Sequence, residues 1–233
     1  MAKGEKSASG SLREGIQLYR IKRWEAALEE LLAVNPAQLA EGEGIELAYY
    51  LGLCYTKLAR YEEALLYLEQ VVTSGEDPLR VYQCRMVLAY IYLETGRSKM
   101  AEFELGRLAG AGFESAQLYN AQGYAAWAQK RFPEAVECYE KALGMDEQNG
   151  TALNGIGYVL VDGDIDITRG LAYCKQAVEL RPRNAAYLDS LGWAYFKHGE
   201  LPEARLWMRR ALDAAPEEQV IREHYRIVAG GRD

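Results

Sequence analysis

Small residues recur along this chain at two sets of regularly spaced positions. Members of the first set are 37, 37, 34, 34 and 35 residues apart, and each is followed by a member of the second set 12 residues later, or 13 in the fifth pair. The first set is Gly15, Gly52, Ala89, Gly123, Gly157 and Gly192, and the second is Ala27, Ala64, Ala101, Ala135, Gly170 and Ala204. A period near ~34 residues with helical patterning is typical of stacked helix pairs. The repeat therefore predicts an all-α solenoid.

The last repeat shows the pattern most clearly. Leu188, Leu191 and Tyr195 have the spacing of one helical face. Gly199 is expected to end this helix, and Pro202 opens the next one, where its missing N–H is harmless.

This pattern resembles the tetratricopeptide repeat, and the resemblance covers nearly the whole chain. The motif residues of the last unit are Leu188, Leu191, Gly192, Tyr195, Gly199, Leu201, Ala204, Met208, Ala211 and Pro216. Those of the second unit are Leu51, Gly52, Tyr55, Tyr61, Ala64, Leu68 and Val71. The resemblance implies a right-handed superhelical α-solenoid of antiparallel helix pairs. The segments LNGIGYVL and YLDSLGWAYF look like those of bacterial members of the family.

The repeat predicts the organisation of the chain. A flexible N-terminal segment, residues 1–10, precedes six units within residues 11–218, and a capping helix, residues 217–229, and a tail, residues 230–233, follow them. The approximate unit bounds are 8–41, 45–78, 82–115, 116–149, 150–184 and 185–218. The two steps of 37 predict extra residues in the loops Gln38–Gly44 and Thr73–Pro78, and the fifth unit has one extra residue in its internal turn near Asp162–Thr168.

Each set of small residues has an expected packing role. The first set lets the two helices of a unit approach closely, and the second does the same toward the next unit. Bulky residues fill the remaining space.

Composition excludes several classes of function. The net charge of −7 disfavours nucleic acid and anionic membrane surfaces as partners. No apolar run of ~18 residues exists, so membrane insertion is not expected. Residues 1–11 lack the apolar core of a signal peptide, which favours the cytoplasm; the alternative is a periplasmic or envelope-associated protein whose signal segment has been removed. The four cysteines have no C-x-x-C spacing and are expected to be buried free thiols.

No catalytic or cofactor motif is present, so we expect neither an enzyme nor a cofactor. Phosphate-loop, zinc-protease and nucleophile-elbow signatures are all missing, and no metal site is expected. Asp162, Asp164 and Asp166 alternate like the start of a calcium loop, but Ile167 and Tyr173 stand where that loop needs Gly and Glu. A solvated acidic turn is the better interpretation.

The resemblance also implies where a ligand binds. In such arrays the first helices line a concave groove, where equivalent positions give an aromatic wall and a short polar ladder. The candidate peptide-binding residues are Leu53, Tyr90, Asn120, Tyr124, Trp127, Asn154, Tyr158, Asp189, Trp193 and Phe196. Asn side chains can hold a peptide backbone because they both donate and accept. The alternative is that many of these rings belong to the core between repeats.

The family's recognition of acidic chaperone C-termini is not expected here. That mode uses Lys, Asn and Arg on the first helices, and the matching positions do not supply it. They hold Leu12, Ile16, Tyr50, Gln83, Val87, Asn120, Tyr124, Gly155, Ala186 and Ser190.

Two functions remain open. The first is a protein–protein interaction scaffold or adaptor that binds a peptide or helix of a partner in its groove. The alternative is a structural or self-associating subunit of a larger assembly, such as a secretion or envelope complex, with an apolar stripe of Leu12, Ile16 and Tyr19 at the exposed first edge.

Overall fold

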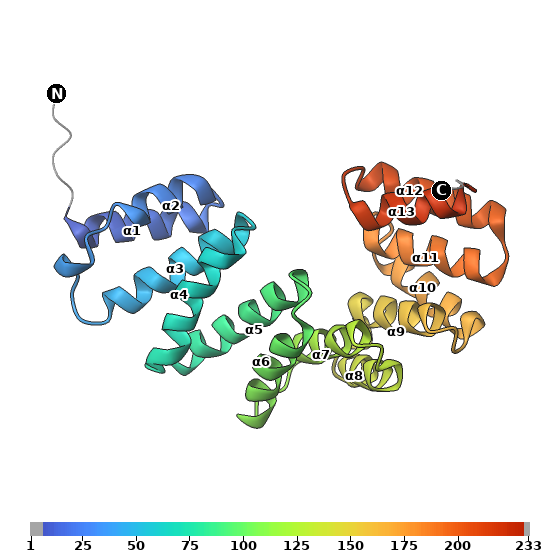
Figure 1. Cartoon of the computed structure of the whole chain (residues 1–233), viewed down its shortest axis with the longest axis horizontal. Coiled ribbons are helices and arrows are strands. Elements are labelled where there is room, and N and C mark those ends of the chain that lie inside the picture. The colour runs from blue at the N-terminus through green and yellow to red at the C-terminus, as the bar shows by residue number, and fades with distance from the viewer. Residues whose placement is uncertain (1–6, 231–233) are drawn as a thin grey trace. The chain divides into compact units, whose positions relative to one another are not determined.

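The computed structural model describes residues 7–230, and in that range it is all-α, with helices and no strand (Figure 1). The α-helices are α1 Ala8–Arg20, α2 Trp24–Leu32, α3 Glu43–Lys57, α4 Tyr61–Ser74, α5 Pro78–Glu94, α6 Ser98–Gly110, α7 Ala116–Ala128, α8 Phe132–Met145, α9 Gly150–Asp162, α10 Ile167–Leu180, α11 Ala185–His198, α12 Leu201–Ala214 and α13 Gln219–Val228. A short 3-10 helix, η1 Pro36–Gln38, precedes α3. The fold is the predicted α-solenoid of helix pairs.

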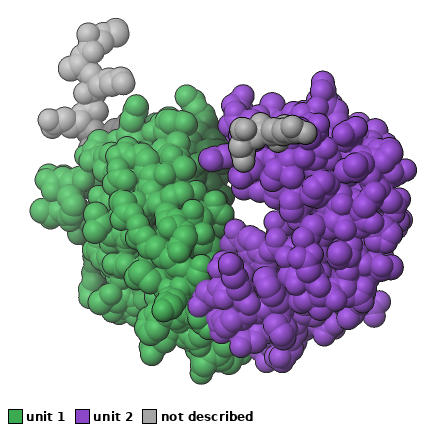
Figure 2. All heavy atoms as spheres, turned by 45° about the vertical axis from the view of Figure 1, so that its right-hand side comes forward, with its two compact units in different colours: residues 1–112 green, residues 113–233 purple. Residues whose placement is uncertain are grey.

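The chain divides into two compact units, residues 1–112 and residues 113–233 (Figure 2). Unit 1 holds three helix pairs, α1–α2, α3–α4 and α5–α6, and unit 2 holds α7–α8, α9–α10 and α11–α12 followed by α13. Within each unit the first helices of successive pairs touch one another, as α7, α9, α11 and α13 do in unit 2.

The turn inside every pair contains one residue with a left-handed backbone. In the sixth pair this residue is Gly199, with φ of 92°, which ends α11 as expected. The equivalent residue of the second pair is Ala59, with φ of 54°, so the same turn forms even where a side chain opposes it. The residues at this position are Lys22, Ala59, Gly96, Lys130, Asp164 and Gly199.

The first set of small residues lies where the two helices of a pair cross. A methyl group added at Gly52 would come within 2.8 Å of the Leu68 side chain, and one at Gly192 within 2.8 Å of Met208 Cγ. In the fifth pair the obstacle is the facing backbone itself: a methyl on Gly157 would lie 2.6 Å from Cys174 Sγ and 2.9 Å from the backbone of both Cys174 and Gly170. These helices approach so closely that only glycine fits.

The expectation for the second set is wrong at Gly170. A methyl group there would lie 2.6 Å from Val161 Cγ2 and 2.8 Å from the carbonyl oxygen of Gly157, both in α9 of the same pair. Gly170 therefore faces its own first helix rather than the next unit, and the two small residues oppose each other across one crossing. The five alanines of this set are fully buried.

Of the two insertions that the steps of 37 residues predict, only the first lies in a loop. It is in the connection between Leu32 and Glu43, which includes η1. The second does not lengthen a loop, because only residues 75–77 connect α4 to α5. It lengthens α5 to 17 residues, against 13 in α7 and α9. Asp77 caps the longer helix by accepting from the backbone N–H groups of Leu79 and Arg80, and Pro78 is its first residue.

The ends of the chain also refine the expected bounds. Helix α1 begins at Ala8, capped by Ser7, so residues 8–10 are helical rather than part of the N-terminal segment. Helix α13 occupies residues 219–228 within the expected 217–229. Residues 1–6 and 231–233 lie outside the described range. The extra residue of the fifth unit is in its internal turn, residues 163–166.

The cysteines are free thiols, as expected. Cys54, Cys84 and Cys174 are buried, and burial raises the pKa of each thiol to about 12. Cys138 is half-buried, and burial raises its pKa as well. Among the described residues, no helix is long and apolar enough to cross a membrane.

The crossing at Gly157 gives a direct stability prediction. Gly157→Ala places a methyl against fixed backbone on the facing helix, so we expect a loss of about 1–3 kcal/mol in the free energy of unfolding. Gly144→Ala in α8 is the matched control, because its methyl would meet nothing within 4 Å and alanine favours the helix by up to about 1 kcal/mol. Thermal melts followed by circular dichroism should show a lower Tm for the first variant only. Equal melting of the two would contradict the assigned crossing.

Candidate functional site

A pocket of about 410 Å³ lies in unit 2 on the first helices of its pairs. Helix α7 contributes Tyr124 and Trp127, and α9 contributes Asn154 and Tyr158. Helix α11 adds Asp189, while α13 and the segment before it close one end. Five of the ten candidate residues therefore come together around one cavity, with a volume in the range of ligand pockets, roughly 300–1,000 Å³.

The wall of the pocket is built around Tyr139 of α8. Its ring lies between two glycines: a methyl on Gly123 of α7 would come within 2.9 Å of the ring, and one on Gly155 of α9 within 2.5 Å. The residue is only 4% exposed, and burial raises the pKa of its hydroxyl. Tyr139 thereby spaces α7 from α9, and both Tyr139 and Gly155 line the cavity.

Three aromatic rings form a continuous cluster at the pocket. The ring of Trp127 lies 5.2 Å from that of Tyr124 and 5.5 Å from that of Tyr158, in tilted and edge-to-face arrangements. The Trp127 indole Nε1 donates to Asp162 Oδ2 over 2.8 Å, which fixes the ring. Tyr124 is 42% exposed, so the cluster opens to solvent at that end.

Asn120 of α7 and Asn154 of α9 each have a buried side-chain oxygen without a hydrogen-bond partner. Asn154 lines the pocket, and its Oδ1 is buried without a hydrogen-bond partner. Asn120 donates through Nδ2 to Asn149 Oδ1 at 3.2 Å, and its own Oδ1 is likewise buried and unpartnered. A buried acceptor without a protein partner costs stability, and an amide oxygen in a cavity can accept a hydrogen bond from a ligand.

Asp189 is held by the last helix. Its carboxylate oxygens lie 2.9 and 3.1 Å from His224 Nδ1, and the residue is 6% exposed. The imidazole also stacks on Trp193 with ring centres 4.4 Å apart. This contact positions α13 against α11 and keeps Asp189 at the pocket wall.

The other candidate residues lie outside this pocket. Trp193 packs against His224 and against the ring of Phe196, 5.2 Å away. Leu53 of α3 and Tyr90 of α5 belong to unit 1. Tyr90 is 47% exposed, and its ring meets that of Tyr61 edge to face at 6.4 Å.

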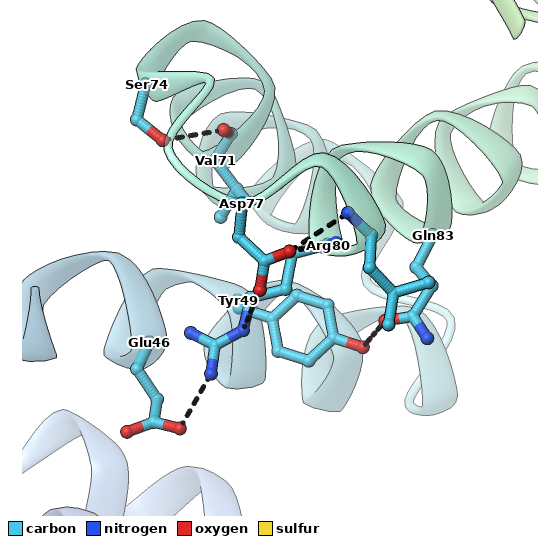
Figure 3. Close-up of polar contacts among 8 residues, drawn as sticks. Glu46, Tyr49, Val71, Ser74, Asp77, Arg80 and Gln83 are labelled. Carbon is cyan, nitrogen blue, oxygen red and sulfur yellow. Dashed lines mark hydrogen bonds and ion pairs between the residues drawn. The ribbon is translucent and has the colours of Figure 1, made fainter.

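In unit 1 polar contacts join the first helices α3 and α5 (Figure 3). The Tyr49 hydroxyl donates to Gln83 over 2.6 Å, and Arg80 pairs with Glu46 of α3 at 3.0 Å and with Asp77 at 3.4 Å. Burial raises the pKa of Tyr49 to about 12. These contacts tie the lengthened start of α5 to α3.

The acidic turn of the fifth pair is structural. Asp162 accepts from Trp127, and Asp164 pairs with Lys197 at 2.7 Å. Asp166 caps α10 by accepting from the Arg169 N–H. Each carboxylate has a different partner, and the described residues contain no cluster that could hold a metal ion.

The expected apolar edge on α1 is not exposed. Leu12 and Ile16 are 1% and 8% exposed because they pack inside unit 1. Tyr19, the third residue of that stripe, is half-buried, and its ring lies 5.6 Å from that of Tyr50. The outer surface of α1 carries Arg13, Glu14, Gln17 and the half-buried Leu18, and Ile21 just after the helix is 59% exposed.

Sequence reasoning missed several residues of the site. Tyr139 and Gly155 were not candidates, although Tyr139 follows Gly123 by 16 residues, as Leu68 follows Gly52, and Gly155 comes directly after the candidate Asn154. His224 was passed over because its partner is 35 residues away. Val220 and Ile221, which line the pocket, stand in the expected capping helix, residues 217–229, where Val220, Ile221, Tyr225 and Val228 have helical spacing.

Comparison with known proteins agrees with this architecture. Three models of the tetratricopeptide repeat match residues 49–82, 116–149 and 166–218, together just over half of the chain. The chain therefore belongs to the tetratricopeptide repeat family.

One curated protein resembles part of this chain in sequence, and several solved structures resemble it in fold. A stretch of 78 residues is 32% identical to the TPR repeat-containing protein PA4667 of Pseudomonas aeruginosa, and it covers 34% of this chain but only 13% of that protein. A tetratricopeptide repeat protein from Parabacteroides merdae superimposes with a TM-score of 0.76 at 12% identity, covering 97% of this chain and 86% of that one. YrrB, described as a TPR protein with an unusual peptide-binding site, gives a TM-score of 0.53 at 16% identity and coverages of 86% and 96%. These likenesses show the fold.

The His224 contact predicts how firmly α13 is docked. His224→Ala removes the partner of a buried carboxylate and a stacked ring, so we expect α13 to be destabilised by about 1–3 kcal/mol. Trypsin should then cleave faster after Arg222 and Arg226 in α13. Gln219→Ala, at an exposed position of α13 that does not flank either arginine, is the control and should leave the cleavage rate unchanged. Unaltered cleavage in His224→Ala would show that the contact does not hold the helix.

Proposed function

We propose that this protein is a non-enzymatic interaction scaffold whose unit 2 pocket binds a peptide or helix of a partner protein. The observation that carries the proposal is the combination of an open aromatic cluster with the unpartnered acceptor of Asn154 in one cavity. Rigid rings supply contact area at little entropic cost, and the amide oxygen can accept from a peptide N–H. The tetratricopeptide fold supports this role.

A self-associating subunit is the weaker candidate. Its contact surface would be the apolar stripe on α1, of which Leu12 and Ile16 are buried and Tyr19 is half-buried. Nucleic acid is not proposed as a partner, since the chain carries a net charge of −7. For the compartment we propose the cytoplasm, which the free, buried thiols support, and keep the periplasm or envelope as the alternative.

Display of a random peptide library against the full chain tests the scaffold proposal. Selected peptides should bind the Tyr124→Ala, Asn154→Ala double variant about tenfold more weakly or worse, because an aromatic anchor and an acceptor are lost together. Tyr90→Ala is the matched control, an equally exposed tyrosine of a first helix in unit 1, and should bind normally. Circular dichroism checks folding.

The contrary result is equally clear. If every selected peptide binds the double variant as tightly as the native chain, the pocket is not the binding site. If Tyr90→Ala loses binding instead, the site lies in unit 1.

A further inference from the structure

The charged side chains that line the pocket are all acidic. Asp189 and Glu218 line the cavity, and none of its lining residues is Lys or Arg. A third carboxylate, Asp162, lies behind the aromatic cluster on Trp127 Nε1. The nearby Lys197 is already paired with Asp164 at 2.7 Å. The basic group beside Asp189 is the His224 imidazole, 2.9 Å away, and no Lys or Arg lines the cavity to meet an anionic ligand.

The hydrogen-bonding groups that face the pocket are also biased toward acceptance. Asn154 Oδ1 is buried and has no donor. Both carboxylate oxygens of Asp189 lie near a single nitrogen, His224 Nδ1. Because a carboxylate can accept about four hydrogen bonds, Asp189 can still accept from a ligand. Burial raises the pKa of the Tyr158 hydroxyl, and the negative charges of Asp162 and Asp189 raise it further.

The aromatic cluster suits the same kind of group. Because Trp127 meets Tyr124 at a tilt and Tyr158 edge to face, the three rings do not stack on one another. A planar cation is attracted to such faces, and arginine is the side chain that most often uses them. Val220 and Ile221 at the closed end offer apolar contact for its methylene groups.

We propose that this pocket takes an arginine side chain of the partner, whose guanidinium lies against the Trp127 cluster and donates to Asn154 and Asp189. The inference rests on the proposed scaffold function and specifies the chemistry of its ligand. A guanidinium has five donors and no acceptor, which complements a lining of carboxylate and amide oxygens.

A titration of the full chain with defined probes tests the inference. The probes are acetyl-Ala-Ala-Arg-Ala-Ala-amide and the same peptide with citrulline, a neutral side chain of nearly the same shape. The readout is the indole N–H signal of Trp127 in spectra of the ¹⁵N-labelled protein, assigned through Trp127→Phe. The arginine peptide should shift this signal saturably, and citrulline should bind about tenfold more weakly. The Trp24 signal in unit 1 should not move.

Two charge-removing variants locate the effect. Glu218→Gln, at an exposed position on the pocket rim, should weaken the arginine peptide about two- to threefold, and Asp189→Asn should weaken it more. Glu223→Gln, exposed on α13 but outside this pocket, is the matched control and should bind normally. Raising NaCl from about 0.05 to 0.5 M should weaken the native complex.

Equal affinity for arginine and citrulline, or an equally strong response to a glutamate probe, would overturn the inference. The library selection separates this failure from that of the scaffold proposal. If the peptides that depend on Tyr124 and Asn154 contain no arginine, the inference fails while the scaffold proposal stands. If no selected peptide depends on those residues, the scaffold proposal fails as well.

Discussion

The ring of Tyr139, held between Gly123 and Gly155, is the contact on which the candidate site depends. It is wide enough to space α7 from α9, yet it fits only because both neighbouring helices present no side chain to it. The aromatic cluster and Asn154 stand on these same two helices. Their spacing is therefore a consequence of backbone packing rather than of the pocket residues themselves.

The same principle recurs through the chain. A small residue at each crossing brings the two helices of a pair into contact, and the common left-handed turn makes the pairs alike. What differs is the surface that the first helices present. In unit 1 the first helices α3 and α5 are linked by polar contacts around Arg80. In unit 2 the first helices line a pocket with aromatic and acidic side chains, to which α13 also contributes. The helix-pair fold is common to the family, whereas the side chains on the first helices determine which ligand could bind.

The sequence predicted the features that depend on local spacing. Glycine and alanine at fixed intervals gave the helix pairs, and equivalent positions gave five of the pocket residues. The longer α5 was missed because Gly75 to Pro78 is typical of a loop, although Asp77 and Pro78 also begin a helix well. The contact of His224 with Asp189 joins residues 35 positions apart and follows from tertiary packing alone. The division after residue 112 follows from how the helices pack, because the repeat itself continues across it.

Amide hydrogen exchange in the Gly155→Ala variant tests whether the Tyr139 ring sets the spacing of α7 and α9. A methyl at this position would lie 2.5 Å from the buried Tyr139 ring, so the ring or the helix must move. We predict faster amide exchange in α7, α8 and α9 of the full chain, with α1 to α4 unchanged. Exchange in α7 to α9 that matches the native protein would show that the Tyr139 contact does not set the helix spacing, and the account of the pocket would be wrong.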